Sequence, residues 1–197
     1  MKRILTGLVL TLMLTGGAAA GPLEDGMAAS ARGDYATALR LLRPLAEEGE
    51  VNAQSFLGAA YAMGWGVPKD YAEAIKWQRL AAEQGDAGAQ SRLGLMYEGG
   101  WGVRKDYAEA IKWYRLAAEQ GYAPAQSDLG LSYKHGRGVP QDYVQAHMWF
   151  NLAASRAPAS EAGVRDMAIK GRDIVASKMT PEQIAEAQKL AREWKPK

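Results

Sequence analysis

The two histidines of this sequence, His135 and His147, are its best candidates for a general base, and the chain has no cysteine. Covalent catalysis needs a nucleophile with a base and an orienting group within reach. His147 stands in a helical pattern where equivalent segments carry Ile75 and Ile111, which indicates a core-facing or edge side chain with one hydrogen-bond partner. The sequence shows no His-x-x-x-His pair and no carboxylate cluster with metal-ligand spacing. We therefore expect no catalytic residue, no metal site and no cofactor.

Serine and glycine recur at a regular spacing, which argues against a catalytic serine and against a nucleotide-binding loop. Ser55, Ser91 and Ser127 are 36 residues apart, whereas a catalytic serine would occur once. Gly-x-Gly pairs follow the same period, at Gly64 and Gly66, Gly100 and Gly102, and Gly136 and Gly138. A nucleotide-binding loop would also need a preceding strand, a third glycine and a Lys-Ser/Thr pair. The serines therefore predict a repeated surface, and the glycines predict turns.

A repeat of 36 residues organises most of the chain. Residues 53–88 and 89–124 are identical at 27 of 36 positions, and a third copy occupies 125–157. A half or degenerate copy precedes them at 26–49. Such a period indicates an array of equivalent units that pack against their neighbours. We assign residues 21–157 to this array.

Each copy contains two helical patterns joined by a tight turn. The first runs from about residue 52 to 63, and Gly58 lies in its apolar stripe, which indicates close packing against a neighbour. Asp70 is the expected N-cap of the second helix, with Glu73 as its capping-box partner and Gly85 as its stop. The second helix is apolar on two sides, and no segment alternates as a half-buried strand does. The sequence therefore predicts an all-α stack of helical hairpins.

The pattern AQxxLGxxYxxGxGVxxDYxxAxxW, followed by LAAEQG, resembles the Sel-one-like repeat, a member of the tetratricopeptide-like superfamily. The positions that carry the resemblance in the first copy are Leu57-Gly58, Tyr61, Gly64, Gly66-Val67, Asp70-Tyr71, Ala74 and Trp77. The resemblance implies a curved α/α solenoid in which the first helix of each pair lines the concave side. It also implies a scaffold that binds protein partners.

The tetratricopeptide geometry, carried over through the Leu-Gly-Tyr register, predicts which side chains face the concave side. In the first copy these are Asn52, Ser55, Ala59 and Ala62. In the second copy they are Gly88, Ser91, Leu95 and Glu98, and in the third they are Pro124, Ser127, Leu131 and Lys134. A small, polar and mildly apolar surface of this kind suits an extended peptide or a helix laid in a groove.

Tryptophans at the turns offer a second candidate surface. Trp65 and Trp101 occupy a turn position where the third copy has Arg137. Edge aromatics of this kind stack on sugars or grip a partner loop; the alternative is that each ring folds back over the neighbouring hairpin. Trp77, Trp113 and Trp149 follow the repeat pattern, and we expect them to pack between helices.

The two ends of the chain depart from the repeat. Residues 1–20 combine Lys2-Arg3, an apolar run and small residues ending in Ala18-x-Ala20, which is typical of a cleavable signal peptide. We therefore expect a periplasmic or secreted protein without a stable membrane anchor after cleavage. Residues 158–197 predict a capping helical hairpin. Its last helix starts with a capping box at Thr180, and we expect the residues after that helix to form a frayed tail.

Charge narrows the class of partner. The chain has 24 Lys+Arg against 22 Asp+Glu, and the two counts become equal without Lys2 and Arg3. A basic surface for nucleic acid is therefore not expected. We expect a non-enzymatic scaffold or adaptor for envelope proteins. The alternatives are glycan binding through the turn tryptophans, and an envelope hydrolase acting on peptidoglycan or a β-lactam; exported relatives linked to β-lactams carry paired cysteines, which this chain lacks.

Overall fold

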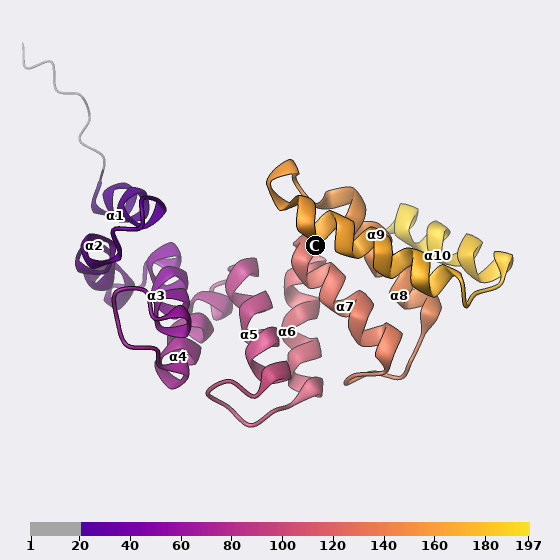
Figure 1. Ribbon diagram of the computed structural model, residues 1–197, viewed down its shortest axis with the longest axis horizontal. Helices are drawn as coiled ribbons and strands as arrows, with labels where there is room; N and C mark the ends of the chain where they lie inside the picture. The colour runs from indigo at the N-terminus through magenta and orange to yellow at the C-terminus, as the bar shows by residue number, and fades with distance from the viewer. Residues whose placement is uncertain (1–20) are drawn as a thin grey trace, which may run out of the picture.

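The computed structural model describes residues 21–197, which form ten α-helices and one 3-10 turn and contain no strand (Figure 1). The predicted leader, residues 1–20, lies outside the described residues. The elements are α1 (Pro22–Ala31), α2 (Tyr35–Glu47), α3 (Val51–Met63), α4 (Tyr71–Glu83), α5 (Ala87–Gly99), α6 (Tyr107–Glu119), α7 (Ala123–His135), α8 (Tyr143–Arg156), η1 (Ala159–Glu161), α9 (Ala162–Ala176) and α10 (Pro181–Glu193).

Successive helices form hairpins that stack along an arc, with α1, α3, α5 and α7 as the first helices of their pairs (Figure 1). Within each hairpin the two helices pack on each other, and the second helix also packs on the first helix of the next hairpin. This double packing is what the two apolar sides of the second helix require. The prediction of an all-α solenoid of helical hairpins is confirmed.

Local signals fix where the helices begin and end. The Asp70 carboxylate accepts hydrogen bonds from the N–H groups of Ala72 and Glu73 at 2.9 and 3.0 Å. Gly64 ends α3 with φ of 77°, a left-handed conformation that favours glycine. The capping box expected at Asp70 is incomplete, because the Glu73 side chain pairs with Lys76. The box at Thr180 is complete, with Gln183 as its partner.

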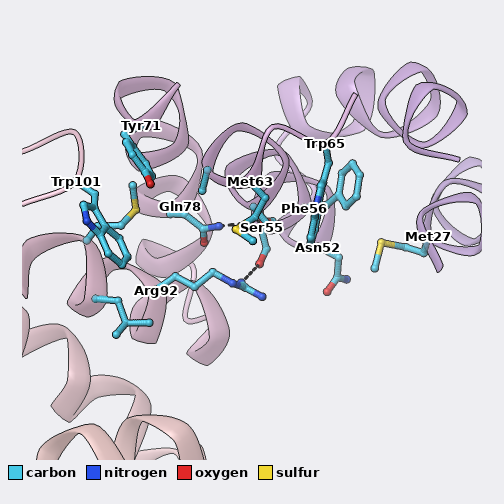
Figure 2. A pocket seen from close by; sticks show the side chains of 14 residues that line it. Met27, Asn52, Ser55, Phe56, Met63, Trp65, Tyr71, Gln78, Arg92 and Trp101 are labelled. Atoms are coloured by element: carbon cyan, nitrogen blue, oxygen red, sulfur yellow. Dashed lines mark hydrogen bonds between the residues drawn. The ribbon is translucent and has the colours of Figure 1, made fainter. Parts of the chain in front are cut away.

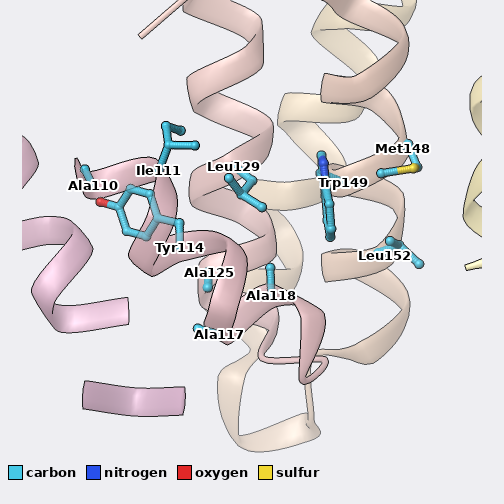
Figure 3. Close-up of a cluster of buried hydrophobic side chains, with 10 residues drawn as sticks. All are labelled: Ala110, Ile111, Tyr114, Ala117, Ala118, Ala125, Leu129, Met148, Trp149 and Leu152. Carbon is cyan, nitrogen blue, oxygen red and sulfur yellow. The ribbon is translucent and has the colours of Figure 1, made fainter. Parts of the chain in front are cut away.

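The hairpins interlock where a glycine faces a large side chain. A Cβ added to Gly94 would lie 2.4 Å from the ring of Tyr114, and one at Gly130 would lie 2.6 Å from Phe150. Leu129 of α7 packs in one cluster with Tyr114 of α6 and Trp149 of α8 (Figure 3). The small residues of the repeat thus let large ones reach across to the next helix.

A repeated hydrogen-bond chain, which the sequence reasoning did not foresee, also joins the hairpins. Gln84 Nε2 donates to the carbonyl of Gly49 and to Gln54 Oε1, and Gln54 Nε2 donates to the carbonyl of Ala46. One repeat later, Gln120 and Gln90 make the equivalent bonds. The buried amides of Gln54 and Gln90 are thus satisfied by exposed glutamines of their own hairpins and by carbonyls of the preceding hairpins, and these bonds fix the register between neighbouring hairpins.

The C-terminal helices cover the last hairpin from two directions. Both α9 and α10 pack against α8 and make few contacts with each other. They therefore cover α8 separately and do not form a hairpin. Trp194, at the end of α10, meets Trp149 edge-on with ring centroids 6.3 Å apart and lies under the Arg156 guanidinium. The tail expected to fray is held, because the backbone N–H of Lys197 donates to the carbonyl of Glu119 at 2.8 Å.

Candidate functional site

A hollow of about 530 Å³ opens on the concave side between the first and second repeats (Figure 2). Its walls come from α3 and α5, its floor includes Gln78 of α4, and the turn residues Trp65 and Trp101 lie toward opposite ends. The residues that line it are Met27, Asn52, Ser55, Phe56, Ala59, Ala62, Met63, Trp65, Tyr71, Gln78, Arg92, Leu95, Met96 and Trp101. Most of these side chains are apolar.

Two repeat positions at this hollow carry smaller or shorter side chains than the next repeat does. Ala62 and Gln78 are equivalent to Glu98 and Tyr114 one repeat later. In that repeat the Tyr114 ring is fully buried, and its hydroxyl donates to Glu98 Oε2 at 2.8 Å. In the first repeat no ring or carboxylate stands at these two positions, and Ala62 and Gln78 line the hollow instead. The site is therefore a local departure from the repeat.

Polar groups of the hollow form a short chain of hydrogen bonds. Gln78 Nε2 donates to the carbonyl of Ser55 at 3.1 Å, and Arg92 Nη1 donates to Ser55 Oγ at 3.0 Å (Figure 2). Ser55 Oγ in turn donates to Asp86 Oδ1 at 3.2 Å. Gln78 Oε1 is buried and has no hydrogen-bond partner among residues 21–197.

The turn tryptophans both stack on the tyrosine that opens the second helix of the preceding hairpin. Trp65 lies 5.1 Å from Tyr35 at an interplanar angle of 3°, and Trp101 lies 5.9 Å from Tyr71 at 16°. Trp65 is half-buried, as the folded-back alternative predicted, whereas Trp101 is stacked and still 46% exposed. In the third repeat Arg137 occupies this position and donates to Glu98 Oε1 at 3.1 Å.

A second hollow of about 470 Å³ continues the concave side between α7 and α9. Leu95 lines both hollows, so the two are adjoining parts of one surface. The second hollow is lined by Leu95, Pro124, Ser127, Asp128, Leu131, Lys134, Phe150, Val164, Met167, Lys170, Gly171 and Ile174. Its apolar side chains from α9 were not foreseen as part of the concave surface.

Two carboxyl groups lie near the boundary between the hollows. Glu98 accepts from Tyr114 and Arg137. Burial and, after it, the negative charge of Glu98 together raise the pKa of Asp128 to about 7. Burial likewise raises the pKa of the Tyr114 hydroxyl, which therefore stays protonated as a hydrogen-bond donor.

The predicted concave residues divide into three groups. Asn52, Ser55 and Ala59 line the first hollow, Leu95 lines both, and Ser127, Leu131 and Lys134 line the second. Ser91 is only 3% exposed and lines neither hollow, so its expected place on the concave surface is wrong. Glu98 is half-buried and bonded within the protein, and it also lines neither.

The candidate base His147 lies in the core and lines neither hollow. His147 is buried, and burial lowers its pKa; its Nδ1 lacks the hydrogen-bond partner that was expected, counting residues 21–197. Within the same range no three His, Cys, Asp or Glu side chains gather as a metal site. No helix there has both the length and the apolar character needed to cross a bilayer.

Comparison with known proteins identifies the repeat. The Sel1 repeat model matches residues 51–86, 87–122 and 123–157, starting two residues earlier than the copies defined from the sequence. No curated protein sequence matches the chain.

Solved structures share the fold. A Sel1 repeat protein from Oxalobacter formigenes is 31% identical with a TM-score of 0.66, over 86% of this chain and 74% of that one. A protective antigen of uropathogenic Escherichia coli with an SLR fold is 30% identical with a TM-score of 0.60, over 80% of this chain and 40% of that one. The present chain thus spans less than half the length of the antigen. With three repeat matches over more than half of its residues, the chain belongs to the Sel1 repeat family.

Proposed function

We propose that this protein is a non-catalytic adaptor of the bacterial cell envelope that binds a protein partner on its concave surface. Sel1 repeats are generally non-catalytic and mediate protein–protein interactions. The observation that carries the proposal is the run of exposed apolar side chains along one side, which two adjoining hollows share through Leu95. Exposed apolar patches of this kind mark interaction sites.

A charge placed at the junction of the hollows tests the binding surface. We expect Leu95→Arg to reduce partner capture about tenfold or more, because it puts a cation where an apolar contact is buried on binding. Leu116→Arg is the matched control, since Leu116 is similarly exposed (46% against 39%) but lines neither hollow. Capture is measured by crosslinking pull-down from native envelope with quantitative mass spectrometry, and circular dichroism verifies helix content. Equal capture by the two variants contradicts the proposal.

The envelope location rests on the sequence of residues 1–20, with its basic start, apolar run and small-residue end. We expect the mature protein to begin after Ala20 and to fractionate with periplasmic or secreted proteins. Mass spectrometry of the N-terminus gives the answer, and an intact Met1 in the purified native protein contradicts export by cleavage.

Glycan binding is the second candidate, because Trp101 is stacked on Tyr71 and still presents an exposed ring beside the first hollow. A sugar would stack on that exposed ring. Titration with peptidoglycan fragments would then change tryptophan fluorescence in the parent and not in Trp101→Ala. Turnover of muropeptides or of a chromogenic β-lactam by the purified protein would instead favour the hydrolase alternative.

A further inference from the structure

We infer that the first hollow binds an extended peptide segment in which an acidic side chain lies next to an apolar one. This inference rests on the proposed function and specifies the chemistry of the partner. Three features of the hollow support it: the space left at Gln78, the unpartnered oxygen of that side chain, and the charge along the surface.

The space is a built feature of this repeat. The next copies fill the position of Gln78 with the rings of Tyr114 and Phe150. Here the shorter Gln78 lines the hollow together with the side chains of Phe56, Met96 and Trp101. An apolar side chain of a peptide fits such a space in place of the missing ring, because it buries apolar surface on both sides.

The floor of the hollow offers a hydrogen-bond acceptor that the protein leaves unused. Gln78 is 1% exposed, and its Nε2 is committed to the carbonyl of Ser55. Because that carbonyl can only accept, the amide orientation is fixed and Oε1 faces away from it (Figure 2). Oε1 has no donor among residues 21–197. A buried acceptor without a donor is costly, and a peptide backbone N–H satisfies it.

The basic side chains that line the hollows favour an acidic side chain in the bound peptide. Arg92 lines the hollow, is exposed, and forms no salt bridge with any residue from 21 to 197. Among residues 21–197 its side chain makes one hydrogen bond, to Ser55 Oγ, the hydroxyl that donates to the Asp86 carboxylate; this bond orients the guanidinium and leaves most of its donors for a ligand. The second hollow, farther along the surface, is lined by two basic residues, Lys134 and Lys170, and by one acidic residue, Asp128. The surface is therefore complementary to a segment that carries negative charge.

A display selection with random dodecapeptides against the full chain tests the inference. We expect the enriched peptides to combine Asp or Glu with an aromatic or large aliphatic neighbour. Gln78→Phe should fold as well as the parent, since Phe150 occupies the equivalent position, yet bind these peptides about tenfold or more weakly, because the ring takes up part of the space and removes the amide acceptor. Circular dichroism and thermal unfolding verify the fold.

Charge reversal provides a second variant that does not depend on filling the hollow. Arg92→Glu should abolish the acidic preference, whereas Arg104→Glu, an exposed turn residue lining neither hollow, should keep it. Peptides that lose binding with Leu95→Arg but show no acidic preference overturn this inference and leave the proposed function standing. A selection that enriches no peptide overturns both.

Discussion

The Gly94→Ala variant is expected to be less stable than the parent by on the order of 3 kcal/mol, the upper range for overpacking a core. The added Cβ would lie 2.4 Å from two ring carbons of Tyr114. That ring is fully buried and its hydroxyl is tied to Glu98, so it cannot move aside without breaking contacts between α5 and α6. Urea unfolding followed by circular dichroism measures the difference.

Two other glycines serve as controls for this variant. Gly163→Ala, in α9, meets no atom within 4 Å, so it should leave stability unchanged or raise it by up to about 1 kcal/mol through helix propensity. Gly58→Ala should fall between the two, because the atoms it meets belong to the flexible side chain of Gln78. If Gly94→Ala unfolds at the same urea concentration as Gly163→Ala, the close glycine–ring packing described here does not hold the hairpins together.

The hairpins could be predicted because the signals for them repeat. Asp70 supplies an N-cap and Gly64 a left-handed helix end, and both are local effects that need no knowledge of the neighbours. The glycine at position 58, within an apolar stripe, likewise indicated that its helix packs closely against a neighbouring helix. What the sequence could not name was the partner of that contact, since Gln78 lies on another helix.

Exposure was harder to predict, because equivalent serines have unequal neighbours. Ser55 is half-exposed, whereas Ser91 is buried. The side chain at position 78, which bonds to the Ser55 carbonyl, is a glutamine; at the equivalent position beside Ser91 it is the larger Tyr114. A periodic sequence therefore predicts the direction of a side chain better than its access to solvent.

The candidate site arises where the repeat is broken. The repeated residues build the arc, and the departures Ala62 and Gln78 both line the first hollow within it. Arg92 is a third departure, since the equivalent position carries Phe56 before it and Asp128 after it. The sequence signal for the candidate site was thus the short set of positions at which the three copies differ. The fold is needed to show which of these positions lie close together.

Replacement of the Asp128 carboxyl is expected to have a large, pH-dependent effect on stability. Asp128→Asn should stabilise the protein at pH 8 and have little effect at pH 4. Burial and the charge of Glu98 raise the pKa of the folded carboxyl to about 7, against 3.8 for an ordinary aspartate. Between these values the unfolded chain has lost the proton and the folded protein retains it, so stability falls as the pH rises. Above pH 7 both states are ionised and the loss is complete.

The size of this effect follows from the pKa difference. A tenfold change in acidity corresponds to about 1.4 kcal/mol, and the half-buried carboxyl keeps some contact with water, so the gain at pH 8 should be about 2–4 kcal/mol. Urea unfolding at a series of pH values, with the exposed Asp166→Asn as control, measures the difference between variant and parent. A difference that does not change between pH 4 and pH 8 would mean that Asp128 is ionised in the folded protein throughout, and that the concave surface carries one more negative charge at neutral pH than its burial allows.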